Sequence, residues 1–136
     1  MKTLFWNVLA GDARVTALVP ANRIVEMSTM LSTVPSPFPF IAYSTTVNQR
    51  SGHGTGMSTI EVTAYDERGT YDGVDAVLRA VRLAVADAGE RTRVRTDGTT
   101  VKLVESVWLG EGPELNDPDL QANMRSTSFQ LVGIGQ

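Results

Sequence analysis

The 136-residue sequence contains no cysteine, a single histidine (His53) and no excess of basic residues. Without cysteine, disulfides, thiolate catalysis and zinc sites built on Cys ligands are excluded. A single histidine likewise excludes metal sites that need several imidazole ligands. The formal net charge of −3 provides no general positive field that would draw the chain to nucleic acid or an anionic membrane. These absences favour a structural or binding role, and we expect no catalytic residues, no cofactor and no metal.

Long apolar runs are also absent, since no stretch approaches the roughly 20 residues that a membrane-spanning helix needs. The N-terminal segment resembles a signal peptide only superficially, because Trp6, Asn7 and Asp12 interrupt its apolar stretch and no small-residue cleavage site follows. We therefore expect a cytosolic chain without a membrane partner. Hydrophobic residues make up 42% and charged residues 20%, which is typical of a globular protein. The length suits one domain spanning residues 1–136.

The N-terminal region is predicted to form two short helical segments. The first has apolar residues at helical spacing, namely Leu4, Phe5, Val8 and Leu9. Asp12 is placed to cap the second segment, which contains Val15 and Val19 and ends at Pro20 because proline blocks helix continuation.

A strand at Arg23–Met27 is predicted to lead into an extended surface arm, Ser28–Pro39. Prolines alternate in the second half of this arm, at Pro35, Pro37 and Pro39. That spacing excludes a helix and most sheet pairing.

From Phe40 onward the pattern changes to the two-residue period of a β-strand, with Ile41, Tyr43, Thr45 and Val47 on one face. A second β-rich run follows at Met57–Asp66. The segment between the two runs, Asn48–Gly56, is too long for a two-residue turn. We therefore predict a hairpin with a projecting loop at residues 48–56.

The longest predicted helix covers Tyr71–Ala88. Its apolar residues recur at three- and four-residue steps, at Val74, Val77, Leu78, Val81, Ala84, Val85 and Ala88. Charged residues fall largely opposite, which is typical of a helix that lies on a sheet. Thr70 or Asp72 is predicted to cap its start, and Gly89 is suited to its C-terminal end.

The rest of the chain is predicted to be mainly β. An arginine-rich strand (Glu90–Arg95), an Asp97–Gly98 turn and a long strand (Thr100–Leu109) precede a polar loop (Gly110–Leu120) and a last strand (Gln121–Val132). Runs of strands around one long amphipathic helix predict an α+β two-layer domain. In that fold a largely antiparallel sheet is packed by the long helix and a short N-terminal helix.

The glycine-rich tip SGHGTG is the first candidate binding segment, with Arg50 and His53 as its contact residues. No Gly-Lys-Ser/Thr follows, so the tip is not a P-loop, and its spacing does not match a dinucleotide-binding motif. Catalysis by His53 has no suitable nucleophile or acid nearby. Two interpretations stay open, a plain hairpin tip and a loop that orders against a protein partner.

Arg91, Arg93 and Arg95 alternate along the predicted strand and would therefore share one face. Three guanidinium groups on one face could bind phosphates or an acidic protein surface. The alternative is a charged edge strand that prevents unwanted sheet pairing.

Acidic residues gather before the last strand, at Glu105, Glu111, Glu114, Asp117 and Asp119, without an intervening basic residue. The order of these carboxylates does not match a calcium-binding loop. The segment is then either a solvated loop or an acidic surface. Such a surface would meet a basic partner or border a channel through which DNA passes.

The layout of the chain resembles the tail-terminator (tail-completion) proteins of long-tailed phages. The resemblance covers nearly the full chain and is carried by the segments DARVTALVPANRI, PFPFIAYSTTVNQ, MSTIEVTAYDE, YDGVDAVLRAVRLAVADA and SVWLGEGPELNDPDLQANMRSTSFQLVG. It implies a hexameric ring that caps the tail tube, ends tube polymerisation and joins the head-side neck or connector protein. It also implies a place in the virion, at the head-proximal end of the tail, after assembly in the host cytoplasm.

Within such a ring, Glu111, Glu114, Asp117 and Asp119 are assigned to an exposed rim or channel, and DNA would pass through without specific binding. Arg50, His53 and the three arginines of the predicted strand are assigned to protein interfaces. Two alternatives remain open: a head-completion or neck connector protein of similar build, and a small α+β ligand-binding protein with a pocket between helix and sheet.

Overall fold

The computed structural model of the chain describes residues 2–30, 35, 37–50, 55–88, 91–94 and 100–134. Seven strands form one sheet in the order β1-β2-β3-β7-β5-β4, with β6 pairing β7 off this path. The strands are β1 (Ile24–Glu26), β2 (Phe40–Arg50), β3 (Thr55–Glu67), β4 (Arg91–Val94), β5 (Thr100–Glu111), β6 (Leu115–Asp117) and β7 (Ala122–Ile134). Only the β1–β2 pair is parallel among these strand pairs. The predicted α+β class with a largely antiparallel sheet is confirmed.

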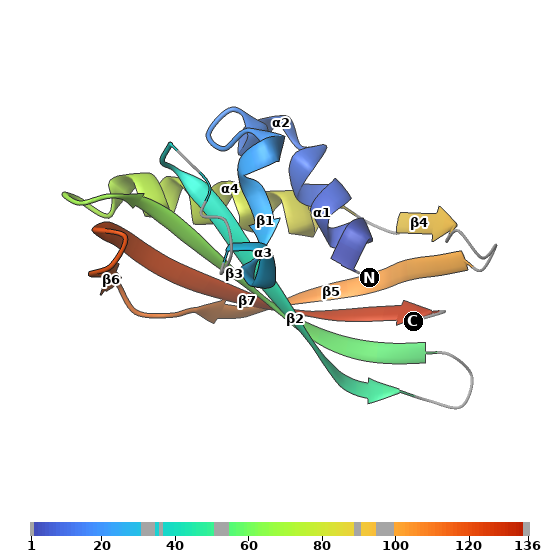
Figure 1. Cartoon of the computed structure of the whole chain (residues 1–136). Coiled ribbons are helices and arrows are strands. Elements are labelled where there is room, and N and C mark those ends of the chain that lie inside the picture. Colours follow the sequence, from blue (N-terminus) through green and yellow to red (C-terminus); the bar gives the residue numbers. More distant parts are fainter. Residues whose placement is uncertain are drawn as a thin grey trace.

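Helices cover one face of the sheet. They are α1 (Lys2–Ala10), α2 (Ala13–Thr16) and α4 (Asp72–Asp87), and Figure 1 shows them together above the sheet. A 3₁₀ turn, Ala21–Arg23, leads into β1. We call the covered side the α4 face, because α4 packs across β3, β7 and β5. None of the described helices is long and apolar enough to cross a membrane.

The main core lies between α4 and the sheet. The predicted apolar stripe is confirmed, since all of its residues are buried except the half-buried Ala88. Below the stripe lie side chains from alternate positions of three strands: Ile41, Tyr43, Ile60, Val62, Phe129 and Leu131. Phe5 of α1 completes this core, with its ring centroid 5.8 Å from that of Tyr43 and 6.3 Å from that of Phe129. The spacing that predicts the helix therefore also selects its buried face.

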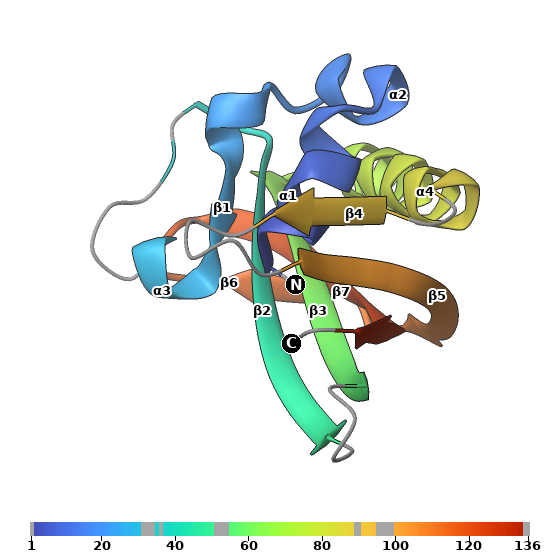
Figure 2. The same cartoon turned by 90° about the vertical axis from the view of Figure 1, so that its right-hand side faces the viewer.

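A second apolar cluster lies on the opposite face of the sheet. Phe40 stacks on Tyr65 at 4.7 Å between ring centroids, and Phe38 stacks on Phe40 at 5.6 Å. Met30 belongs to the same buried cluster and comes from α3 (Met27–Met30), which lies beside β1 and β2 and apart from the other helices (Figure 2).

The prediction of an extended surface arm at residues 28–39 is therefore wrong for its first part. Residues 28–30 are helical, and the side chain of Met30 is buried. The physical reason is that Phe40 and Tyr65 present apolar rings on the face away from α4, and Met30 and Phe38 pack in the same cluster. Residues 31–34 and 36 lie outside the described part of the chain.

The predicted loop at residues 48–56 is also too long. β2 and β3 stay paired as far as Arg50 and Gly56, with a register shift between Val47 and Gln49. β7 pairs β3 along its whole length, from Thr55 to Glu67, and this pairing holds the end of β3 in the sheet. His53 lies among residues 51–54, which the structure does not describe.

The predicted polar loop at Gly110–Leu120 contains strand structure as well. β5 continues to Glu111, and β6 pairs with the start of β7. The reason is that β5 pairs with β7 only from Thr127 onward. The first residues of β7, 122–124, pair with β6 instead. The arginine-rich strand is confirmed as β4, which pairs with the start of β5.

The predicted caps of the long helix are wrong at its start. The N-cap residue is Tyr71, which makes no side-chain capping bond. The turn before α4 is instead held from β7, because the buried Asn123 donates its amide hydrogens to the carbonyl oxygens of Gly69 and Thr70, at 3.1 and 3.2 Å. Gly89 lies outside the described residues.

The packing of α4 predicts that Leu78→Asp prevents folding. Leu78 is fully buried in the middle of the stripe, so the substitution would bury an unpaired carboxylate. Arg79→Ala is the matched control on the exposed side of the same helix, and its effect should stay within about 0.5 kcal/mol. Circular dichroism melts measure both variants. A melting temperature of Leu78→Asp equal to that of the wild type would contradict this packing.

Candidate functional site

The acidic segment folds around a basic residue from β7. The Arg125 guanidinium binds Asp75 of α4 at 3.0 Å and approaches Glu111 at 3.5 Å. Its Nε donates to the Gly112 carbonyl oxygen at 2.8 Å. Hydrogen bonding to Asp75, with Glu111 and Glu114 nearby, raises the pKa of Arg125. One predicted rim residue, Glu111, is thus partly neutralised by a cation that lies fourteen positions later and is adjacent only in the fold.

The other predicted rim residues differ in what they do. Asp117 accepts hydrogen bonds from the backbone N–H groups of Asp119 and Leu120, at 3.0 and 3.1 Å, and so holds the turn between β6 and β7. Glu114 and Asp119 are exposed. A further bond ties this region to the start of α4, because the Tyr71 hydroxyl donates to the Leu115 carbonyl oxygen at 2.7 Å. The structure therefore leaves Glu114 and Asp119 as the more available carboxylates of the four.

The predicted basic interface residues lie largely beyond what the structure describes. Arg91 and Arg93 belong to β4, but only their backbone pairing with β5 is described. Arg50 ends β2, and its side chain is likewise not described. Arg95 and His53 lie outside the described residues altogether. The structure does not bring these five side chains together in one described site.

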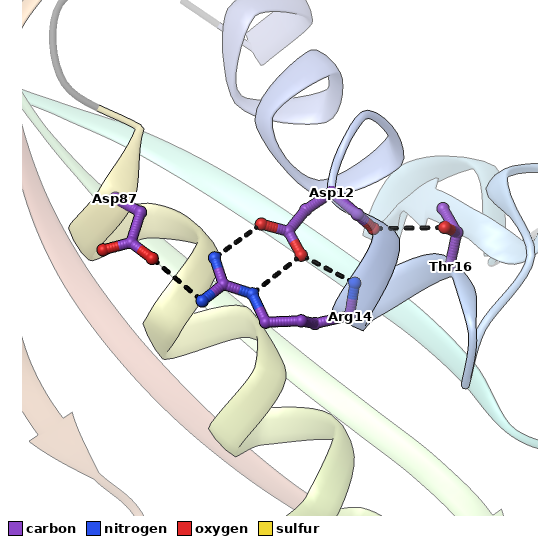
Figure 3. Close-up of polar contacts among 4 residues, drawn as sticks. All are labelled: Asp12, Arg14, Thr16 and Asp87. Atoms are coloured by element: carbon purple, nitrogen blue, oxygen red, sulfur yellow. Dashed lines mark hydrogen bonds and ion pairs between the residues drawn. The ribbon is translucent and has the colours of Figure 1, made fainter.

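A charged contact fixes α2 to the end of α4 (Figure 3). Asp12 caps α2, as predicted, by accepting the Arg14 backbone N–H at 2.8 Å. The Arg14 guanidinium binds the Asp12 carboxylate at 2.8 Å and the Asp87 carboxylate of α4, also at 2.8 Å. The hydrogen bond from the Arg14 side chain lowers the pKa of Asp12, and both carboxylates raise the pKa of Arg14.

An apolar groove of about 570 Å³ lies next to this contact, between α2 and α4. Its apolar lining consists of Ala17, Leu18, Ala76, Ala80 and Leu83. Leu18 and Leu83 are 39% and 38% exposed, so the groove is an open surface feature. A smaller cavity of about 80 Å³ lies between α4 and β5, and it is well below the usual size of a ligand pocket.

Three consecutive apolar residues of β5 are exposed: Val107 at 42%, Trp108 at 45% and Leu109 at 53%. The Trp108 indole N–H donates to Thr127 at 2.8 Å, and the Arg82 guanidinium lies 4.7 Å from its ring centroid. These contacts hold the large ring in a defined position although nearly half of it faces solvent. We call Val107, Trp108 and Leu109 the β5 apolar row. Sequence reasoning found the strand but not this exposure, because the position of a strand in a sheet is set by its partners.

The face opposite α4 has a polar strip beside the second cluster. Strand alternation and register place these side chains in it: Ser44, Thr46, Thr59, Glu61, Ser126, Ser128 and Gln130. The strip is rich in hydroxyl groups and contains one carboxylate, Glu61, while the same register places Glu105 and Lys102 farther along this face. Among the described residues, no group of His, Asp and Glu side chains is arranged to hold a metal ion.

No protein-family model and no curated protein matches the sequence. The fold is similar to a chain of the "virion of native gene transfer agent (GTA) particle", with a TM-score of 0.71. The alignment covers 99% of this chain and 95% of that chain, and 14% of the aligned residues are identical. At this identity the likeness establishes a shared fold over essentially the whole chain.

The Asp12–Arg14–Asp87 contact predicts a pH-dependent difference between wild type and Asp12→Asn. Asparagine keeps the capping oxygen but loses the charge, so the variant should be less stable at pH 7. Because the folded-state pKa of Asp12 lies below 3.8, its charge stabilises the fold above that pH and stops doing so as the pH falls through the lowered value.

Urea unfolding at pH 7 and pH 2 measures this difference. The difference between the two proteins should be smaller at pH 2 than at pH 7. Asp12→Ala is the control for the cap itself and should cost about 1 kcal/mol. An equal difference between wild type and Asp12→Asn at both pH values would contradict the assignment.

Proposed function

We propose that this protein is a virion structural protein of the tail-terminator type, which forms a ring on the tail tube and ends its polymerisation. The observation that carries the proposal is the fold likeness to a gene transfer agent virion chain, because it spans 99% of one chain and 95% of the other. The sequence segments that resemble tail terminators point to the finer role.

The surface of the protein supports a role in assembly. The β5 apolar row and the α2–α4 groove are separate exposed apolar features of one chain. In a closed ring, one surface of a protomer meets a different surface of the next, and a further exposed surface is free to meet the tube or neck protein. Proteins of this size otherwise tend to keep such residues scattered or covered.

The distribution of charge supports a ring around DNA. DNA must move through a tail without binding to it, and a basic lining would bind phosphates through counterion release. The polar strip offers mainly hydroxyl groups and Glu61 instead, and the one lysine that the register places on this face, Lys102, lies at its far end. Exposed Glu114 and Asp119 are proposed for the rim, where carboxylates repel phosphates over about 8 Å at physiological salt. Arg50, His53, Arg91, Arg93 and Arg95 remain proposed protein contacts, to the next protomer, the tube protein or the neck protein.

A head-completion or neck connector protein is the second candidate. The same observation favours it, because the chain of similar fold belongs to a whole gene transfer agent virion and is not restricted to the tail by that description. The two roles differ in what their loss does to the particle. A terminator limits tail length, whereas a connector joins two parts that are each already complete.

Deleting the gene in the particle that carries it tests the proposal. We expect tails of normal diameter and abnormal length that are not joined to heads, measured by negative-stain electron microscopy. Wild-type protein supplied in trans should restore tail length, and Leu78→Asp should not. Normal-length tails lying free beside heads would favour the connector instead, and normal particles would contradict both roles.

A further inference from the structure

We propose that copies of this chain join edge to edge, with β5 of one protomer pairing with β2 of the next, so that neighbouring sheets become one continuous antiparallel sheet. The inference rests on the proposed ring and names the surface that would build it. It requires two unpaired strand edges on opposite sides of the sheet, at matching heights and with matching strand directions. The described strands meet each of these requirements.

Both outer edges of the sheet are only partly covered. β1 pairs β2 at residues 41–43, so residues 44–49 of β2 have β3 alone as a strand partner among the described residues. β4 pairs β5 at residues 100–103, so residues 105–110 of β5 have β7 alone in the same described set. Figure 2 shows β2 and β5 on opposite sides of the β3–β7 pair. We call residues 44–49 and 105–110 the two open edges.

The two open edges lie at the same position along the strand direction, on opposite sides of the sheet. Thr46 pairs with Thr59, Thr59 with Gln130, and Gln130 with Val107. The neighbouring row runs in the same way from Thr45 through Ile60 and Phe129 to Trp108. The covering strands β1 and β4 therefore sit at opposite ends of the sheet and leave the same rows open on both sides. A copy placed beside the first, without a shift along the strands, brings one open edge against the other.

The strand directions also match. The successive pairs β2–β3, β3–β7 and β7–β5 are all antiparallel, so β2 and β5 run in opposite directions. Rotation about a ring axis preserves the direction of each strand relative to that axis. β5 of one protomer would therefore meet β2 of the next in antiparallel orientation. The alternation of the sheet then continues across the junction without a break.

The open edges carry little of the side-chain protection that blocks pairing, although each contains one register shift, between Val47 and Gln49 and between Trp108 and Gly110. Natural sheets block exposed edges with lysine, proline or inward-pointing charge. Residues 44–49 read STTVNQ and contain none of these, and the β2 edge is thus uncharged. The β5 edge carries the exposed β5 apolar row, with Glu105 as its only charged residue. A long edge of this kind is a site where another strand can pair. Burial of the β5 apolar row would add a hydrophobic contribution to the stability of the junction.

A second copy fits these edges better than an unrelated strand does. An added peptide would cover one edge and leave the other unprotected. Twofold pairing of β5 with β5 would have the same result at β2. Head-to-tail pairing covers both edges of every protomer with a single kind of contact, and it closes when the ring is complete.

Cysteine cross-linking tests the junction, and the chain has no native cysteine to interfere. Thr46 and Val107 lie in one row on the face opposite α4, so Thr46→Cys and Val107→Cys would face each other across the junction. Under mild oxidation we expect the double variant to lose its monomer band and give a ladder that stops at one species. Each single variant should stay monomeric on the denaturing gel, and an equal mixture of the two should stop at the dimer.

Two further pairs complete the design. Ser44→Cys with Val107→Cys covers the adjacent register on the same face. Leu18→Cys with Thr46→Cys is the matched control, because Leu18 is exposed in the α2–α4 groove and away from both edges. Light scattering before oxidation gives the oligomeric state of each variant.

The outcomes separate this junction from the proposed function. An oligomer in which neither Val107→Cys pair cross-links more than the control overturns the edge-to-edge junction and leaves the proposed ring intact. Cross-linking of Val107→Cys alone means twofold β5 pairing and also overturns it. A chain that stays monomeric, both alone and with tail-tube protein, overturns the junction and the proposed ring together.

Discussion

The pairing of β3 with β7 is the constraint on which the rest of the structure depends. Both strands are 13 residues long and pair from end to end, from Thr55 opposite Ile134 to Glu67 opposite Ala122. This uninterrupted ladder fixes which side chains share a face. Ile60 and Phe129 point to α4 and the main core, while their neighbours form the polar strip. A one-residue slip would exchange the two faces, and the apolar side chains of both strands oppose it.

Position in this ladder explains how much could be predicted from the sequence. The face of α4 follows from local spacing, because Leu78 and Val81 lie on one stripe whatever the helix packs against. The start of the same helix does not follow, since the turn before it is held by Asn123 from a strand some fifty residues later. Similarly, Met30 is helical and buried because Phe40 and Tyr65 create an apolar surface, which proline spacing alone does not reveal.

The candidate site shows the same limit more strongly. Glu111 and Glu114 belong to a stretch of sequence that contains no lysine or arginine. In the folded chain, however, the pairing of β7 brings Arg125 against Glu111. The strand containing Val107 and Trp108 is predictable from its composition, but its place near the sheet edge is not. Its position opposite residues 44–49 depends on register and on the shifts near Asn48 and Leu109. Gly110, with a φ of 133°, marks the second shift, but no glycine or proline marks the first. Surfaces for assembly therefore emerge from the pairing of strands, and charge patterns in the sequence identify them only in part.

Hydrogen–deuterium exchange tests the central claim most directly, measured at protein concentrations below and above the concentration at which the chain assembles. Backbone amides that gain a strand partner exchange more slowly, whereas amides already paired change little. The account predicts slower exchange on assembly in residues 44–49 and 105–110 together, with the same concentration dependence, while the β3–β7 pair stays constant. Unchanged exchange in both open edges, with slower exchange confined to the α2–α4 groove, would contradict it.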